Sequence, residues 1–77
     1  MNKYMKMSKE EAYSGYTSNE GGPFGAVITD KEGNIISQGH NMVLKNNDPT
    51  AHAEVTAIRK ACEKLGTYDL SNYILYT

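Results

Sequence analysis

The first pattern along the chain is an amphipathic one near the N-terminus. From Lys3 to about Tyr16 the residues are mostly tolerant of helical structure. At about 100° per residue, one sector of such a helix collects Met1, Tyr4, Met5, Ser8, Ala12 and Tyr16. Stripes of Met and Tyr at helical spacing are typical of core packing. We therefore predict a helix here and assign no chemistry to it.

Two apolar runs separated by turn residues follow this helix. Phe24 to Thr29 is a short run with β-branched residues, and it comes after the turn-rich segment Ser18 to Pro23. The segment Asp30 to Asn34 consists of turn-forming residues, with Gly33 able to adopt a positive φ. Ile35 to Gly39 then has the pattern of the returning strand. The sequence predicts a buried strand followed by a β-hairpin.

A second helix is expected after the polar and irregular stretch His40 to Asn47, in which we place His40 at the surface. Asp48-Pro49-Thr50 offers a capping side chain, with proline at a permitted first-turn position, and Gly66 can end the helix. Apolar residues recur at spacings of three and four. They predict a buried face made of Val55, Ile58, Cys62 and Leu65.

The last segment, Tyr73 to Thr77, is aromatic and apolar and predicts a third strand. The order helix, strand, strand, helix, strand indicates an α/β layer architecture. A strand reached through a helical crossover is expected to run parallel to one strand of the hairpin. At 77 residues the chain has room for one domain or part of one.

Composition and charge exclude several classes of function. Eight Lys and Arg residues against nine Asp and Glu residues give a net charge of −1, so there is no electrostatic basis for binding a nucleic-acid backbone. The single cysteine, Cys62, excludes an internal disulfide framework and a zinc site built from several thiolates of this chain. No segment resembles a signal peptide or a membrane span. We expect a cytoplasmic protein.

The candidate chemistry lies at the start of the second predicted helix, where His52 and Glu54 stand two residues apart. A histidine can ligate zinc through a neutral ring nitrogen. A glutamate beside the metal can move a proton of a bound water molecule without being a ligand. Taken alone the His-x-Glu pattern is weak, because a single histidine near a helix start is more often a surface or capping residue.

The surrounding segments make the pattern more specific. Zinc-dependent nucleobase deaminases carry the signature H-x-E followed by P-C-x-x-C, and this chain matches its first half. The segments Gly21 to Ile28, Gly39 to Asn41, Asp48 to Glu54 and Tyr73 to Thr77 resemble the cytidine deaminase-like superfamily in order and spacing, and bacterial guanine deaminases most of all. The resemblance covers nearly the whole chain. It implies a three-layer α-β-α sandwich with a mixed sheet, of which residues 1–77 are the N-terminal part of one CMP/dCMP deaminase-type zinc-binding domain.

The resemblance also implies roles for individual residues. His52 matches the zinc ligand and Glu54 the residue that shuttles protons. Asn41 matches a residue that hydrogen-bonds the substrate ring, Phe24 lies in the segment that lines the base pocket, and the backbone N–H of Ala53 matches another substrate contact. The implied reaction is hydrolytic deamination of a small purine base, with guanine giving xanthine and ammonia. Without the flanking motifs, Asn41 would be read as a loop residue and Phe24 as a core residue.

The resemblance ends before the P-C-x-x-C segment of the family. A catalytic zinc needs three protein ligands and one open position, and the chain offers His52. Cys62 cannot complete the set, because it lies ten residues beyond His52, or about 15 Å along a helix axis. We expect half of a deaminase site, inactive alone, with weak or absent stoichiometric zinc in the fragment itself.

Two hypotheses from different classes follow. In the first, the chain is the N-terminal half of a zinc-dependent guanine deaminase-like enzyme, which the resemblance implies is a homodimer when complete. Guanine is favoured over adenosine in tRNA by the segment Gly21 to Gly25 and by the lack of basic charge, and a cytosine nucleoside is a further alternative. In the second, the chain is a noncatalytic truncated remnant or half-domain that associates through an exposed strand edge at Ile74 and Leu75.

Overall fold

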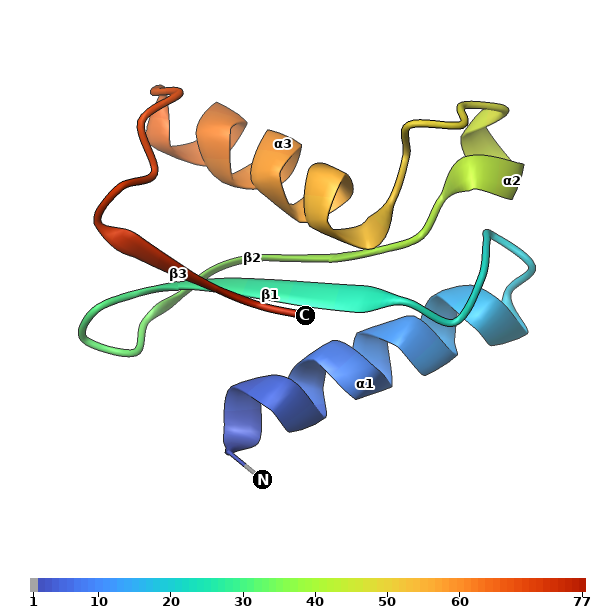
Figure 1. The fold of residues 1–77 in the computed structure, drawn as a ribbon, viewed down its shortest axis with the longest axis horizontal. Coiled ribbons are helices and arrows are strands. Elements are labelled where there is room, and N and C mark those ends of the chain that lie inside the picture. Colours follow the sequence, from blue (N-terminus) through green and yellow to red (C-terminus); the bar gives the residue numbers. More distant parts are fainter. Residues whose placement is uncertain (1) are drawn as a thin grey trace.

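The computed structural model describes residues 2–77. The elements are α1 (Lys3–Thr17), β1 (Gly25–Asp30), β2 (Ile35–His40), α2 (Val43–Asn46), α3 (Ala53–Leu65) and β3 (Tyr73–Tyr76). Figure 1 shows α3 on one face of the sheet and α1 on the other, which gives three layers. The expected α/β sandwich is therefore confirmed, while Met1 lies outside the described residues.

The sheet has the strand order β2-β1-β3, and β1 pairs antiparallel with both neighbours. β3 therefore runs in the same direction as β2, as the crossover predicts, but it lies on the other side of β1. No two neighbouring strands are parallel within residues 2–77, so the expected mixed sheet is not found in this part. The reason is that the connection through α3 passes over β1 and places β3 at the far edge.

The central strand β1 is buried from Gly25 to Thr29. Ala26 and Ile28 pack against α3, so alternation turns Val27 and Thr29 towards α1. The predicted hairpin turn is confirmed: Oδ1 of Asp30 accepts hydrogen bonds from two backbone N–H groups of the turn, at 2.9 and 2.8 Å, and Gly33 has φ +89°. Phe24 was expected in the strand and instead lies one residue before it.

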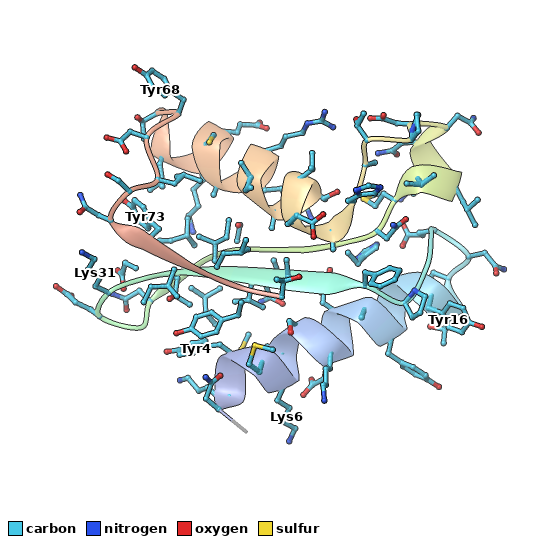
Figure 2. All side chains as sticks on the ribbon, viewed as in Figure 1. Tyr4, Lys6, Tyr16, Lys31, Tyr68 and Tyr73 are labelled. Carbon is cyan, nitrogen blue, oxygen red and sulfur yellow. The ribbon has the colours of Figure 1, made fainter. Side chains whose placement is uncertain are left out.

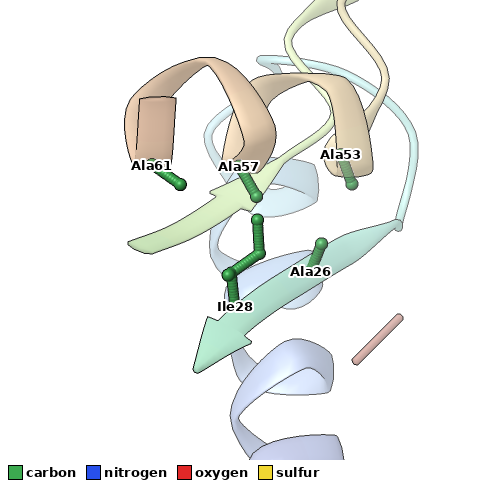
Figure 3. Close-up of a cluster of buried hydrophobic side chains, with 5 residues drawn as sticks. All are labelled: Ala26, Ile28, Ala53, Ala57 and Ala61. Carbon is green, nitrogen blue, oxygen red and sulfur yellow. The ribbon is translucent and has the colours of Figure 1, made fainter. Parts of the chain in front are cut away.

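The buried face of α3 differs from the prediction. It consists of Ala53, Ala57 and Ala61, which point towards Ala26 and Ile28 (Figure 3). The predicted residues Val55, Cys62 and Leu65 are only partly buried, and Ile58 is 37% exposed. Small side chains form the contact stripe because the helix lies close to β2, and the larger apolar residues are displaced to its flanks.

The start of α3 also differs from the prediction. Oδ1 of Asp48 accepts hydrogen bonds from the backbone N–H of Thr50, at 2.9 Å, and from its hydroxyl group, at 2.7 Å. This local turn uses the carboxylate that was expected to cap the helix. The helix instead begins at Ala53, with extended His52 at the N-cap position, and it ends at Gly66 with φ +68° as predicted. The stretch expected to be irregular contains α2, a single helical turn.

The predicted N-terminal helix is confirmed as α1, which buries Ser8, Ala12 and Gly15. Tyr4 contributes to the interior as expected, because its ring stacks on that of Tyr76 in β3 with centroids 5.0 Å apart. Tyr16 is exposed, contrary to its place in the predicted sector (Figure 2). No helix among residues 2–77 combines the length and the apolar character needed to cross a membrane.

Candidate functional site

A cavity of about 340 Å³ opens where β1 begins, β2 ends and α3 begins. Its wall is formed by Phe24, Asn41, His52, Ala53 and Glu54, so all five candidate residues border the same space. Three separate segments supply them: the residue before β1, the residue after β2 and the start of α3. The volume lies near the lower end of small-molecule pockets, which run from about 300 to 1,000 Å³.

The start of α3 contributes an imidazole and a carboxylate. Nδ1 of His52 lies 3.7 Å from Oε1 of Glu54, which is beyond hydrogen-bond distance, and both side chains reach solvent. Glu54 lies in the first helical turn, where the helix dipole favours a negative charge. The carboxylate is therefore free to act on a group in the cavity.

Ala53 offers a backbone donor at the same place. The first N–H groups of a helix have no acceptor within the helix. Within the described part of the chain, no hydrogen bond is found from the N–H of Ala53, although the residue itself is buried. This N–H group is available to a ligand in the cavity.

Asn41 is held in a defined orientation beside the cavity and is only 9% exposed. Its backbone N–H donates to the carbonyl of Phe24 at 3.1 Å, and its side-chain Oδ1 accepts from the backbone N–H of Val43 at 3.1 Å. Because Oδ1 must face a donor, this bond fixes which end of the amide is the NH₂ group. Asn41 borders the cavity, and no hydrogen bond from its Nδ2 is found among residues 2–77, which leaves two donors available.

The loop that leads to His52 is fixed by a small polar network. Nη1 of Arg59 on α3 lies 3.4 Å from Oδ2 of Asp48. The bonds from Thr50, and secondarily Arg59, hold the pKa of the Asp48 carboxyl below its usual value. The carbonyl of Ala51 accepts from the backbone N–H of Met42 at 2.9 Å, which ties the loop to the end of β2.

The residues present do not by themselves fit a complete catalytic zinc site. No three His, Cys, Asp or Glu side chains of residues 2–77 lie close enough together to hold a metal ion. His52 borders the cavity and can be one of the three ligands that such a zinc needs. Cys62 does not line the cavity.

His40 was expected at the surface and is instead mostly buried, with its side chain 12% exposed. Its Nδ1 lies 2.7 Å from Oε1 of Glu11 on α1, and its Nε2 lies 3.2 Å from Oε1 of Glu20. A β-carbon at Gly15 would collide with the imidazole ring. Gly15, which leaves room for the ring, is the residue of the predicted helix that this contact requires to be small.

Comparison with known proteins connects this geometry to a family. Residues 1–77 match the family described as the cytidine and deoxycytidylate deaminase zinc-binding region. The chain is 57% identical over 74 residues to the guanine deaminase of Bacillus subtilis (strain 168), which covers 96% of this chain and 47% of that protein. It is 45% identical over 73 residues to a tRNA-specific adenosine deaminase of Aquifex aeolicus (strain VF5), which covers 95% of this chain and 47% of the relative. The chain thus spans about half the length of these curated relatives.

A solved structure confirms the cytidine deaminase-like fold. The X-ray structure of guanine deaminase from Bacillus subtilis superposes with a TM-score of 0.91 at 54% identity, covering 99% of this chain and 49% of that one. The expected resemblance to bacterial guanine deaminases is therefore confirmed. On the match over residues 1–77 and on these identities, the chain belongs to the cytidine and deoxycytidylate deaminase family, within its zinc-binding region.

Proposed function

We propose that residues 1–77 form the N-terminal half of a zinc-dependent hydrolase that deaminates a free purine base, converting guanine to xanthine and ammonia. The observation that carries the proposal is that one cavity is lined both by the candidates for binding the base and by Glu54, the candidate for proton transfer. The remaining metal ligands would come from the half of the domain that the relatives have outside the aligned region.

Three residues would hold the base. Phe24 presents an exposed ring at the cavity mouth, suited to packing against a planar heterocycle. The Nδ2 group of Asn41 and the N–H of Ala53 offer hydrogen-bond donors, which complement the ring nitrogen and carbonyl oxygen acceptors of a purine. These contacts would orient the ring carbon that bears the amino group towards Glu54.

Glu54 would move the protons of the reaction. Hydrolytic deamination forms a bond from a water oxygen to the ring carbon and breaks the bond from that carbon to the exocyclic nitrogen. Glu54 would accept a proton from the attacking water and pass it to the ring nitrogen beside the attacked carbon. It would then carry the remaining hydroxyl proton to the amino group, which leaves as ammonia while the carbonyl forms. Glu54 lies in the first turn of α3, where the helix N-terminus interacts favourably with negative charge.

His52 would be one zinc ligand. The cavity position of its exposed imidazole suits this role, and two further ligands must come from outside the described residues. When bound, zinc acts as a Lewis acid and lowers the pKa of a bound water molecule to about 7. The completed enzyme is proposed to be cytoplasmic and, as the resemblance implies, a homodimer.

Guanine is favoured over adenosine in tRNA as the substrate. Identity to the guanine deaminase is 57%, against 45% for the tRNA-specific adenosine deaminase. The net charge of −1 also gives no electrostatic attraction for a tRNA backbone.

The test is to co-express the chain with the second half of the Bacillus subtilis guanine deaminase and to assay the purified complex. Xanthine formation from guanine is expected, with no inosine formed in tRNA. Glu54→Gln should lower the rate about 10²- to 10⁴-fold, which is the usual contribution of a general acid–base group. The exposed α3 variant Glu63→Gln is the matched control. A zinc-loaded complex that deaminates no nucleobase would remove the assignment.

A second candidate is a noncatalytic chain that associates through β3. Ile74 and Leu75 are 38% and 43% exposed, and the outer edge of β3 has no strand partner among residues 2–77. Exposed apolar edges of this kind favour strand pairing between chains. Light scattering distinguishes the candidates: this one requires a defined dimer or larger oligomer of the chain alone, and a monomer counts against it.

A further inference from the structure

Glu20, in the turn between α1 and β1, forms a salt bridge through one carboxylate oxygen: its Oε2 lies 3.1 Å from Nζ of Lys45 in α2. Its Oε1 lies 3.2 Å from Nε2 of His40 at the end of β2, although Nε2 makes no hydrogen bond within residues 2–77. The Glu20 side chain is only 18% exposed. The bond from Lys45, aided by the nearby His40, keeps the pKa of the Glu20 carboxyl below its ordinary value. One side chain thus contacts both segments that flank the loop of Asn41.

The backbone of Glu20 also binds α2. Its carbonyl oxygen accepts hydrogen bonds from the N–H groups of Leu44 and Lys45, both at 3.1 Å. These two residues belong to α2, which would otherwise be a single isolated turn without a buried residue. The position of α2 therefore depends on the turn at Glu20.

Asn41 lies between the two segments that Glu20 connects. On one side, a β-carbon at Gly21 would collide with the Asn41 side chain, so the Gly21 backbone lies directly against it. On the other side, the N–H of Val43 in α2 donates to Asn41 Oδ1 at 3.1 Å. Movement of either segment would release the amide that faces the cavity.

We propose that Glu20 is a positioning residue for Asn41. Its carboxylate holds the loop at Gly21 against α2. These two segments fix the Asn41 amide with its NH₂ group towards the cavity. The His40 ring lies beside the Glu20 carboxylate, and its Nδ1 lies 2.7 Å from Oε1 of Glu11 on α1. The inference rests on the proposed function only in so far as Asn41 contacts the substrate.

Hydrogen exchange of the ¹⁵N-labelled 77-residue chain, followed by NMR, tests the proposal without any substrate or metal. In Glu20→Ala, exchange of the Val43 amide should accelerate about fivefold, the factor that corresponds to losing one typical hydrogen bond. The Asn41 Nδ2 signals should shift at the same time. Exchange at Ala57 and Ala61 in α3 should be unchanged, because a local positioning role does not alter the core.

Matched variants separate positioning from general stability. Lys45→Met removes one partner of the Glu20 carboxylate and should accelerate Val43 exchange in the same direction, and it provides the readout if Glu20→Ala does not fold. Glu20→Gln keeps an acceptor for Lys45 and should restore part of the protection. Glu63→Ala removes an exposed glutamate of α3 and should change none of these signals.

Two results would overturn the inference. One is unchanged Val43 exchange in Glu20→Ala, or in Lys45→Met if the first variant is unfolded. The other is equal acceleration at Val43, Ala57 and Ala61, which would show that Glu20 acts on overall stability. Neither result bears on whether the completed protein deaminates a base, so failure here is distinguishable from failure of the proposed function.

Discussion

Gly39 of β2 and Ala57 of α3 pack backbone against backbone: a β-carbon at residue 39 would lie 2.7 Å from the backbone nitrogen of Ala57 and 3.0 Å from the carbonyl oxygen of Ala53. This close approach sets the distance between α3 and the sheet. It also brings the start of α3, with His52 and Glu54, beside Asn41 at the end of β2. The geometry of the cavity thus depends on two residues that do not line it.

Enlarging this contact should destabilise the fold. Ala57→Leu is expected to lower the free energy of unfolding by about 1–3 kcal/mol, as overpacking of a tight core contact does. Glu63→Leu places the same side chain on the exposed face of the same helix and should change stability by less than about 0.5 kcal/mol. Urea unfolding monitored by circular dichroism measures both. Equal effects of the two variants would show that the contact is not tight.

The stacked rings of Tyr4 and Tyr76 should couple α1 to β3. A double-mutant cycle with Tyr4→Leu and Tyr76→Leu is expected to give a coupling energy of about 0.5–1.5 kcal/mol. Tyr4→Phe alone should cost about 1 kcal/mol, because the hydroxyl group donates to the carbonyl of Gly33 at 2.7 Å. Tyr68→Phe, at a fully exposed ring, is the control for loss of a hydroxyl. Strict additivity in the cycle would contradict the coupling.

The Asp48 turn should make stability depend on acid pH. Because its bonds to Thr50 and the nearby Arg59 lower the folded-state pKa of Asp48 below the ordinary 3.8, the unfolded chain binds this proton more readily. The stabilising contribution is therefore present above that value and is lost as the pH falls through the folded-state pKa. The stability of Asp48→Asn should decline less steeply than that of the wild type as the pH falls through this range. The urea midpoint of unfolding, measured at a series of pH values, follows this decline. Glu63→Gln serves as the control, and parallel curves for Asp48→Asn and wild type would refute the prediction.

Local chemistry was sufficient to predict several features from the sequence. Gly33 and Gly66 adopt the positive φ angles that their turn positions suggested. For these two glycines the signal lies within a few residues of the position concerned. The candidates Phe24, Asn41 and His52 came instead from the resemblance to the deaminase family, and the structure brings them to one cavity.

Features that depend on distant contacts were not predictable in this way. Hydrophobic spacing assigned Ile58 to the core, but the depth of α3 on the sheet is set by Gly39, in a different element. His40 and Glu20 look like ordinary polar loop residues until the fold brings α1 and α2 to them. One local feature was also missed: Asp48 was assigned to capping the helix, but its carboxylate bonds Thr50 instead.

The central claim is that the chain contributes one zinc ligand, His52, together with a carboxylate that is not a ligand. Elemental analysis for zinc tests it most directly, on the purified 77-residue chain and on its complex with the second half of the Bacillus subtilis guanine deaminase. The account predicts far less than one zinc per chain for the chain alone and about one per complex, lost in His52→Ala and retained in Glu54→Gln. Near-stoichiometric zinc in the chain alone, or full zinc in the His52→Ala complex, would contradict it.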